Sequence, residues 1–590
     1  MEQLMPEPPF LATTALPEFW DPEREILFLG PWCRRQDRRR DWEGLRAQTL
    51  PSPWEDRERF HAAAEYLDRR MEQILPPLAE RLNSHLGHPG DLRYWRILIG
   101  TWLMHSLQVA YDRYVHLSEA LKRRPDLKTL LLDPACFRTP ADTHQAVNWM
   151  MTDDPYNLQL FSQLMTGMGC SFPARALRSA APADRSGSPA AALKQKLRGA
   201  LRGAQSALSQ LLEKRAQAGL IEMYCPASVV WTLSWKSGFK AVPSTLPESN
   251  PRRAGEPAAP LLQDRRRSAL ASLPATDEFL RLWIRSLPEN FPTLYLEGFQ
   301  AARERALRRL RHAPHTLVSA TGWHYSEPFK FFAAEHSRRG GRLVAVQHGS
   351  GYSLFRSMPM EQHERRISDS FLGWEEAPSL QLAGLRARRP NPTAGRQRLL
   401  FVTTTNPRYP FRFYSAPQAH QLEDYFDWQA RFLKSLGPLL RSRMVIRLHP
   451  LDFGHCLRQR LERRLPGLRW DRRRSFAGSA AKSRMLVVDH PGTPMLTALS
   501  GNFPTLLFWD PRLWEFGPEA QSHLELLRQA GLFQDDPEAA AAALEKILLE
   551  GPERWWSRAP VQAARRRFVE RYAPSPSDWL RVWAERAVNQ

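Results

Sequence analysis

Cysteine is scarce in this sequence, and its spacing argues against two kinds of architecture. The 590-residue chain has five cysteines, which lie far apart, and no C-x-x-C motif occurs. Small disulfide-rich domains need paired cysteines, and structural zinc sites need closely spaced ones. The sequence therefore predicts neither a disulfide framework nor a zinc cluster.

Long apolar runs are also lacking. The longest apolar stretch, residues 97–111, is shorter than a membrane-spanning helix and is interrupted by His105 and Gln108. The first seven residues have neither the basic segment nor the apolar core of a secretory signal. We therefore expect a cytoplasmic protein, and its charge adds peripheral contact with the inner membrane as a second expectation.

Apolar and basic residues are abundant. Hydrophobic residues make up 43% of the chain, with 20 Trp and 28 Phe, which is ample material for folded cores. The formal net charge of +21 suggests an anionic partner, which could be nucleic acid, an anionic membrane surface or a phosphorylated substrate. Arginine supplies most of the excess positive charge and is spread along the chain, so part of this charge reflects a general compositional bias. Because no known nucleic-acid-binding motif occurs, we expect no nucleic acid partner.

One βαβ unit is predicted over residues 316–347. An apolar run at 316–320 is followed by a loop, by a helix from Pro328 to about residue 339, and by a second apolar run at 342–347. Proline at the helix start and two glycines after its end agree with helix-terminus preferences. The unit should therefore contribute two parallel strands to a sheet.

A glycine-rich loop closes this unit. Its residues are His348, Gly349, Ser350 and Gly351. The loop fits neither the dinucleotide-binding consensus nor the P-loop consensus. We expect its glycines to let the backbone turn sharply at the ligand-facing edge of the sheet, and the alternative is an ordinary tight turn.

A second α/β pattern begins at residue 399. Its apolar runs, which alternate with helical stretches, lie at 399–404, 444–448, 485–489 and 505–509. Two such patterns predict an α/β protein with two Rossmann-like domains facing a cleft, with extra helices in the N-terminal half. The expected extents are 1–385 for the N-terminal α/β domain, 386–398 for a linker, 399–555 for the C-terminal α/β domain, and 556–590 for C-terminal helices that pack back on the N-terminal domain. Flexible insertions are expected at about 174–218 and 243–274, where Ala, Arg, Ser and Pro dominate.

Two strand ends in the second half are candidate phosphate sites. The run at 444–448 ends in His449 and Pro450, and the run at 485–489 leads through His490 to Gly492 and Thr493. The carboxyl ends of parallel strands carry ligand sites, and helix-start amides favour anions. Thr493 is the expected N-cap, with proline at the first helical position. The alternatives are a strand-ending turn at His449 and an ordinary capped core helix after residue 492.

Acid–base and carboxylate-binding candidates are less well defined. Asp112, at the end of an apolar helix, could act as general base toward an acceptor hydroxyl, or it could belong to a solvated helix end with an internal salt bridge. His348, on the first domain, is another candidate catalytic group. The rivals for the base lie just after the glycine-rich loop and are Glu361, His363 and Glu364. The arginines near strand ends that could pair with a carboxylate or phosphate of a ligand are Arg408, Arg412 and Arg447.

Several motifs together resemble a transferase family encoded in bacterial O-antigen and surface-polysaccharide loci. They lie at residues 10–14, 26–33, 94–100, 111–114, 347–352, 555–556 and 571–572. More distantly, the sequence is similar to GT-B glycosyltransferases that use CMP-activated acidic sugars such as Kdo or sialic acid. This similarity implies the GT-B type of fold, with the acceptor on the side of residues 1–385 and the nucleotide donor bound by residues 399–555. The resemblance implies that His449, Pro450, Gly492 and Thr493 bind the nucleotide phosphate. The family's usual turn resembles Tyr-Asn-Ser/Gly-Thr-Thr, whereas this chain has His-Pro-Gly-Thr-Pro at 490–494.

The resulting hypothesis is a glycosyltransferase of lipopolysaccharide or other surface-glycan assembly that needs no metal or other cofactor. It would move a sugar from a nucleotide donor, with a CMP-linked acidic sugar favoured, to a glycan or lipid-linked acceptor. Arg447 and Arg408 would join the phosphate site. Two alternatives stay open: a CDP-alcohol phosphotransferase of the same fold, and a non-catalytic, anion-binding protein of polysaccharide assembly.

Overall fold

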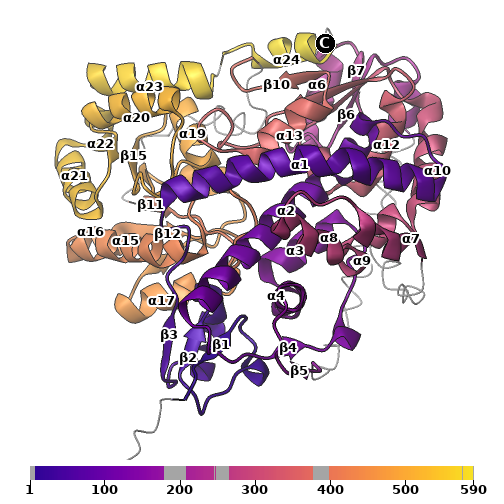
Figure 1. Ribbon diagram of the computed structural model, residues 1–590. Helices are drawn as coiled ribbons and strands as arrows, with labels where there is room; N and C mark the ends of the chain where they lie inside the picture. The colour runs from indigo at the N-terminus through magenta and orange to yellow at the C-terminus, as the bar shows by residue number, and fades with distance from the viewer. Residues whose placement is uncertain are drawn as a thin grey trace, which may run out of the picture.

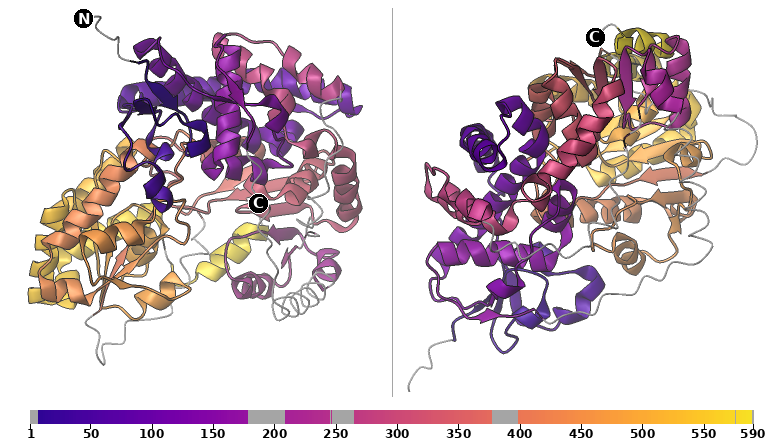
Figure 2. Two further views of the ribbon diagram at one scale, coloured as in Figure 1. Left: turned by 90° about the horizontal axis from the view of Figure 1, so that it is seen from below. Right: turned by 90° about the vertical axis from the view of Figure 1, so that its right-hand side faces the viewer.

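The computed structural model describes residues 7–177, 208–244, 246, 265–376, 398–574 and 576–588. In Figure 1 its second α/β domain, orange to yellow, lies at the left and the first α/β sheet at the upper right, and Figure 2 shows both sheets on the same side of two long N-terminal helices. Among the described helices, none has the length and apolar character needed to cross a membrane.

A small parallel sheet opens the chain. It consists of β1 (Phe10–Ala12), β2 (Ile26–Phe28) and β3 (Ala47–Thr49), in that order. Its buried side chains pack against the end of the second long helix, whose Leu117 and Ala120 belong to the same apolar cluster. The sheet therefore extends the helical part of the N-terminal half.

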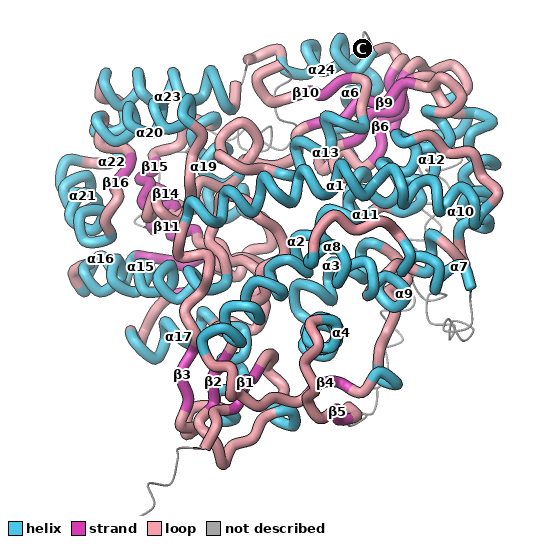
Figure 3. Tube along the Cα trace, in the orientation of Figure 1, coloured by secondary structure: helices cyan, strands magenta, loops and turns pink. Residues whose placement is uncertain are grey.

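Two long helices, α1 (Arg57–Leu86) and α2 (Leu92–Arg123), form the centre of the molecule. Asp56 and Asp91 accept hydrogen bonds from first-turn amides, and Gly87 ends α1 in the left-handed conformation, so local capping sets both boundaries. Helix α2 is buried on nearly all sides, because α1, α3 (Thr143–Thr152), α4 (Asp154–Gly167), α8 (Glu278–Arg285) and α12 (Glu327–Ser337) pack around it (Figure 3). The extra helices expected in the N-terminal half are present, but α2 continues past Asp112 to Arg123, so the expectation that Asp112 ends a helix is wrong.

The first Rossmann-like sheet has five parallel strands. They are β6 (Ala218–Ile221), β7 (Ala241–Pro243), β8 (Thr316–Ser319), β9 (Arg342–Val346) and β10 (Ser370–Leu372), in the order β10-β9-β8-β6-β7. The order reverses between β6 and β8, and ligands of open α/β sheets bind at such a switch point. The predicted βαβ unit is confirmed as β8, α12 and β9.

The other helices of the N-terminal half are shorter. They are α6 (Ala227–Lys236), α7 (Arg265–Ser268), α9 (Leu287–Asn290), α10 (Phe299–Arg309), α11 (Gly322–Tyr325), α12 (Glu327–Ser337) and α13 (Pro359–Ile367). The predicted flexible insertions need correction at their edges, because residues 174–175 and 218 are in strands, 208–213 and 265–268 are helical, and 243 ends β7. The remaining parts of both stretches fall largely outside the described residues.

The second sheet has six parallel strands. They are β11 (Leu399–Val402), β12 (Met444–Arg447), β13 (Arg469–Trp470), β14 (Met485–Val488), β15 (Thr505–Phe508) and β16 (Phe533–Gln534), in the order β13-β12-β11-β14-β15-β16. This is the order of a dinucleotide-binding Rossmann sheet, with its switch point between β11 and β14. The four predicted apolar runs of this half are all strands. The predicted linker at 386–398 lies outside the described residues except for Arg398.

Helices cover both faces of this second sheet. They are α15 (Leu422–Ser435), α16 (Pro438–Arg443), α17 (Leu457–Arg464), α18 (Phe476–Ala480), α19 (Thr493–Ser500), α20 (Pro518–Gln529), α21 (Pro537–Glu550), α22 (Pro552–Trp556) and α23 (Ala559–Tyr572). The last helix, α24 (Trp579–Val588), instead contacts α6 and β7 of the first domain, and in the left view of Figure 2 it lies apart from the other yellow helices. Its Trp583 belongs to the same apolar cluster as Val318 and Val344 of the first sheet.

Loops that leave the carboxyl ends of β9, β11 and β15 meet one another. Phe355 forms a β-bridge with Phe516, and the Arg356 N–H donates to the Glu515 carbonyl at 3.0 Å. The Ser415 N–H donates to the Ser357 carbonyl at 3.2 Å. The carboxyl-terminal edges of the two sheets therefore face each other, and the predicted GT-B arrangement of two Rossmann-like domains is confirmed.

Residues 403–418, which we call the bridging segment, belong to the second domain but run along α2. Its backbone is held by polar side chains of that helix: Arg113 donates to the Pro410 carbonyl at 2.8 Å, and Gln108 accepts from the Phe413 N–H at 2.8 Å. His105 Nδ1 lies 3.2 Å from the Phe411 carbonyl oxygen. The polar residues that interrupt the apolar stretch of α2 therefore bind the bridging segment.

Candidate functional site

Asp489 and His490 follow β14, at the switch point of the second sheet. Asp489 is buried and accepts from the Tyr425 hydroxyl at 2.9 Å and from Gln429 Nε2 at 2.8 Å. His490 Nδ1 lies 2.9 Å from the same carboxyl group. Burial raises the pKa of Asp489 although these partners oppose the shift. The carboxyl group fixes the orientation of the imidazole ring.

The turn after His490 differs in detail from the prediction. Gly492 is the N-cap of α19, and Thr493 is the first helical residue rather than the cap. A Cβ at position 492 would come 2.4 Å from the His490 ring, so only glycine fits against this imidazole. Pro494 lacks an N–H, and the N–H groups of Gly492 and Met495 already have backbone acceptors. The helix start therefore offers an anion chiefly the Thr493 N–H, which is fewer donors than we expected.

His449 lies just beyond β12, as predicted, and is half-buried. Its Nδ1 atom lies 3.2 Å from the Leu451 nitrogen and 3.1 Å from the Leu451 oxygen. Burial lowers the pKa of His449, and a positive charge on His490 would lower it further, so the two imidazoles are neighbours. Pro450 is exposed at the following turn.

Two predicted anion-binding arginines are already paired, and we correct both assignments. Arg447 lies 2.6 Å from Asp471 and also donates to the Arg473 carbonyl at 3.0 Å. Arg408 is buried, with Nη2 at 2.9 Å from Asp154. A phosphate would have to displace these partners, at the cost of leaving a buried carboxylate unpaired.

Arg412, in the bridging segment, differs from these two. It is half-buried between aromatic rings, 3.9 Å from the Tyr414 centroid and 4.8 Å from the Phe411 centroid. In the part of the chain that the structure describes, no carboxylate pairs with it. Its charge lowers the pKa of His324 and of His348, so the guanidinium lies near the carboxyl-terminal edge of the first sheet.

His348 joins a cluster of buried groups on the first domain. Its Nδ1 lies 3.4 Å from Glu364 Oε1, and His324 Nε2 lies 2.5 Å from the same oxygen. The Tyr352 hydroxyl lies 3.0 Å from Glu364 and 3.1 Å from His348. Glu364 and His324 are buried, whereas the His348 side chain keeps 20% of its surface exposed. His348 is therefore the member of this cluster that a ligand can reach.

Burial shifts the pKa of each ionisable group in the cluster toward the neutral form. It raises the pKa of Glu364 to about 8 and lowers the pKa of His348 to about 4 and of His324 to about 3. Both imidazoles are consequently uncharged at neutral pH, when a nitrogen of His348 can accept a proton.

The glycine-rich loop turns differently from the prediction. None of its residues has a positive φ, and the left-handed residue is Ser353, at φ 57°. Gly351 is needed for another reason, because a Cβ there would come 2.9 Å from the Phe355 ring. Gly349 has no such constraint; its carbonyl accepts from Gln347 at 2.8 Å. Ser350 is buried beside it.

Asp112 and Glu361, two of the predicted catalytic groups, are held by hydrogen bonds and ion pairs, and we correct their assignment. Asp112 is 1% exposed, accepts from Trp54 Nε1 at 2.7 Å, and pairs with Arg113. Of the alternative that we considered for Asp112, the internal salt bridge is present, but the residue does not lie at a solvated helix end. Glu361 pairs with Arg365 at 2.9 Å on the surface of α13 and accepts from a loop N–H. Glu361 nevertheless lies near the cluster of His348, since its charge raises the pKa of Glu364 and of Tyr352.

Sequence reasoning missed several groups at these edges. Glu222 and Tyr224 follow β6 with φ values of 47° and 51°, a conformation that costs energy for residues with a side chain. Burial raises the pKa of Glu222, and the Tyr224 ring is 6.3 Å from that of His348. Thr405 follows β11, and its buried hydroxyl has no hydrogen-bond partner in the described structure. The triplet of threonines after a strand was the available signal for this last residue.

His324, His348 and Glu364 could also hold a metal ion. Their ligand atoms lie within 4.8 Å of one another, and two imidazoles with one carboxylate are a zinc-type set. The same atoms are already joined by hydrogen bonds, since Glu364 Oε1 contacts both His324 and Tyr352. Two further atoms of the cluster, His324 Nδ1 and Glu364 Oε2, are buried without a hydrogen-bond partner in the described structure.

Comparison with known proteins gives the family. The chain matches a family model described as LIC12162 family transferase over residues 9–586. No curated protein matches the sequence.

Solved structures with a similar arrangement are remote. The Staphylococcus aureus MnaA–UDP structure is 12% identical over 63% of this chain and 94% of that one, with a TM-score of 0.34. The UDP-GlcNAc 2-epimerase from Neisseria meningitidis bound to UDP-GlcNAc is 10% identical over 60% of this chain and 98% of that one, with a TM-score of 0.33. The glycosyltransferase SnogD from Streptomyces nogalater is 14% identical over 63% and 98%, with a TM-score of 0.29. Because the family model spans nearly the whole sequence, the chain belongs to the LIC12162 family of transferases.

Proposed function

We propose that this transferase is a glycosyltransferase that moves a sugar from a nucleotide donor to a surface-glycan acceptor, as in O-antigen synthesis. The observation that carries the proposal is the pair of facing strand edges, one with His449 and His490 and the other with His348 backed by Glu364. Glycosyl transfer needs both a site for the leaving phosphate and a base for the acceptor hydroxyl.

The leaving phosphate is assigned to the second domain. Asp489 holds the His490 ring by Nδ1, while His449 and the Thr493 N–H supply further donors. Donors arranged before the reaction stabilise the charge that develops on the leaving oxygen. Pro450 and Gly492 shape the two turns. Arg447 and Arg408 have no part in this revised site, since each is already paired.

The acceptor proton is assigned to His348. Its uncharged imidazole accepts the hydroxyl proton as the new glycosidic bond forms, and Glu364 and Tyr352 hold the ring in position. Asp112 and Glu361 are withdrawn from this role because both are held in ion pairs. Gly349, Ser350 and Gly351 place His348 at the edge of the sheet.

The favoured donor is a CMP-linked acidic sugar such as Kdo or another nonulosonate. Arg412 supports this choice, because an unpaired guanidinium near His348 suits a sugar carboxylate. The acceptor is a glycan or a lipid-linked glycan. The net charge of +21 supports peripheral contact of a cytoplasmic protein with an anionic inner membrane, which liposome flotation at low and high salt would test.

A thermal-shift panel of CMP, CDP, UDP and GDP tests the proposal most directly. A nucleotide that binds only the folded protein raises its melting temperature. We expect CMP to give the largest shift, and no shift with any nucleotide would refute a nucleotide-dependent transferase. We also propose that the reaction needs no metal, so transfer should survive dialysis against EDTA. Loss of transfer, with recovery on adding zinc, would instead assign a metal to His324, His348 and Glu364.

One observation keeps a second function in view. The turn after β14 presents His490 and a proline where hydroxyl-bearing residues are usual in the resembling family. Two imidazoles at a phosphate also suit a CDP-alcohol phosphotransferase of the same fold. Incubation with CDP-glycerol and with a CMP-linked acidic sugar separates the two, because only the true donor releases CMP. Release from neither would favour a non-catalytic, anion-binding protein of polysaccharide assembly.

A further inference from the structure

A cavity of about 350 Å³ lies between α1, α2 and residues 356–366. It is separate from the strand edges that carry His449 and His348. Its volume lies in the range of pockets that hold small molecules. The helices that form two of its walls are additions to the first Rossmann-like domain.

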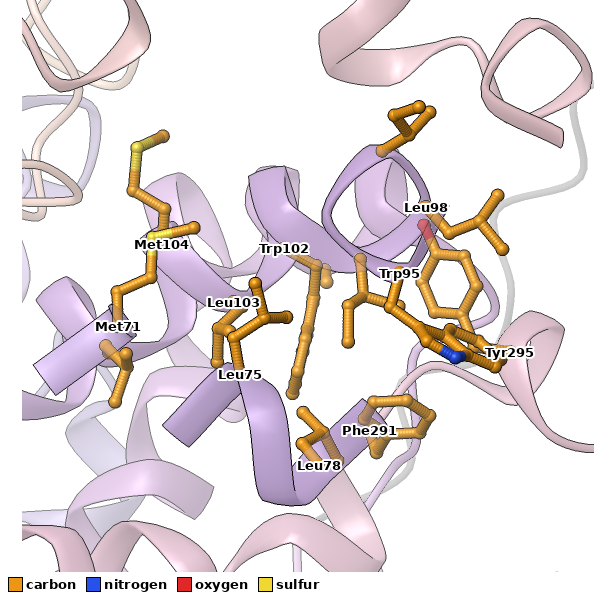
Figure 4. Close-up of a cluster of buried hydrophobic side chains, with 14 of the residues drawn as sticks. Met71, Leu75, Leu78, Trp95, Leu98, Trp102, Leu103, Met104, Phe291 and Tyr295 are labelled. Carbon is orange, nitrogen blue, oxygen red and sulfur yellow. The ribbon is translucent and has the colours of Figure 1, made fainter. Parts of the chain in front are cut away.

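The floor of the cavity is largely apolar. Leu67 and Met71 of α1 and Met104 of α2 line it, and Figure 4 shows the two methionines side by side at one end of the buried cluster between these helices. Flexible thioether side chains adapt to the apolar face of a ligand. A bound ring could therefore rest on this surface.

Two buried polar side chains also line the cavity. His363 is 2% exposed, with Nε2 3.4 Å from the Thr101 hydroxyl, and its Nδ1 has no hydrogen-bond partner in the described structure. Gln108 uses its carbonyl oxygen to accept from the bridging segment, which leaves its amide nitrogen as a donor. Gly100 permits the close approach of the imidazole, because a Cβ there would come 2.5 Å from the His363 ring. Buried polar groups without partners are costly, and a ligand hydroxyl could pair with the Gln108 amide.

The exposed mouth of the cavity is basic. Arg69 and Arg356 line it and have no ion-pair partner among the described residues, whereas the third arginine, Arg366, pairs with Asp68 at 2.8 Å. Glu65 is the unpaired carboxylate on the same rim. Two free guanidinium groups outweigh it and favour a ligand that carries a negative charge.

The cavity is coupled to the proposed catalytic base. His363, in its wall, is followed directly on α13 by Glu364, which contacts His348. His61, in the opposite wall, lies 3.0 Å from Glu515 of the second domain, and the N–H of Arg356 donates to the carbonyl of the same residue. All the residues that line the cavity belong to the N-terminal half of the chain, and these two contacts with Glu515 connect its walls to the second domain.

We infer that this cavity binds the acceptor as an anionic sugar, whose hydroxyls meet Gln108 and His363 and whose carboxylate or phosphate meets Arg69 and Arg356. The inference rests on the proposed glycosyltransferase function, since an acceptor site has meaning only for a group transfer. A uronic acid and a glycosyl phosphate share the required chemistry, and the experiment distinguishes them.

Saturation-transfer NMR on the full-length protein tests this site with three probes: glucuronic acid, glucose 1-phosphate and glucose. We expect transfer to at least one anionic probe and weaker transfer to glucose, with the stronger anion identifying the source of the charge. Arg356→Ala should weaken anion binding by about tenfold, the loss of one charge-assisted contact. Equal signals from glucose and both anions would refute the charge assignment.

A variant with a filled cavity and a matched control variant complete the test. Ala64→Trp places an indole in the cavity, whereas Glu80→Trp places one on the exposed face of the same helix. The first change should abolish sugar binding and the second should preserve it, with circular dichroism confirming that both variants fold. Sugar binding that persists in folded Ala64→Trp, or no sugar binding by the wild type, overturns the inference. The nucleotide-induced thermal shift, measured in parallel, separates the two proposals. Nucleotide binding without sugar binding refutes only the sugar site in the cavity. Sugar binding without any nucleotide-induced shift refutes only the proposed transferase function.

Discussion

Replacement of Glu364 by glutamine tests whether this buried carboxyl keeps its proton at neutral pH. Burial raises its pKa to about 8 from an ordinary 4.5. The folded protein then holds a proton that the unfolded chain has lost, so this contribution to stability is complete below about pH 4.5 and is lost as the pH rises through 8. The linkage relation assigns about 1.4 kcal/mol of this loss to the interval between pH 7 and pH 9.

Urea unfolding at pH 7 and pH 9 measures this difference. The imidazoles of His324 and His348, with pKa values of about 3 and 4, stay uncharged over that interval. The wild type should lose about 1.4 kcal/mol more of its unfolding free energy than Glu364→Gln does. Glu80→Gln, on the exposed face of α1, is the control and should follow the wild type. Equal pH dependence in all three proteins would refute the raised pKa and the proton-holding role derived from it.

Three further predictions concern single residues. His348→Ala should lower kcat/KM by about a hundredfold without changing the nucleotide-induced thermal shift, and an unchanged rate in steady-state assays would remove His348 as the base. His449→Ala should lower transfer by about a hundredfold and weaken nucleotide binding in calorimetric titrations; normal turnover would return His449 to an ordinary turn. Asp154→Ala leaves Arg408 buried without its carboxylate and should cost about 3–5 kcal/mol in urea unfolding, whereas lost nucleotide binding at unchanged stability would restore Arg408 to the phosphate site.

Local chemistry made much of the fold predictable. Proline and glycine bound the helix between β8 and β9, and runs of aliphatic residues identified four strands of the second sheet. Strand β6, by contrast, reads Ala-Gly-Leu-Ile in an alanine-rich region and has no β-branched residue until its end. Its strand character comes from pairing with β7 and β8, which a local pattern does not contain.

The position of the candidate site was predictable from the sequence, but the hydrogen-bond and ion-pair partners of its residues were not. His449 lies at a strand end because parallel strands place their carboxyl ends along one edge. Arg408 is also close to a strand end, but Asp154, its ion-pair partner, lies 254 positions earlier in the sequence. Glu364 could not be distinguished from Glu361 by spacing, since the choice depends on which face of α13 is buried against His324.

The bridging segment has a consequence for how the molecule could be divided or recombined. Its backbone carbonyls and N–H groups satisfy Arg113, Gln108 and His105 in the middle of α2, and Arg408 neutralises Asp154. Expressed alone, the first half would keep these buried polar groups without partners, and the second half would expose the apolar residues between them. A chimera that exchanges the donor domain must therefore also exchange the matching surface of α2. The second domain is tied to the central helix and is not an independent module.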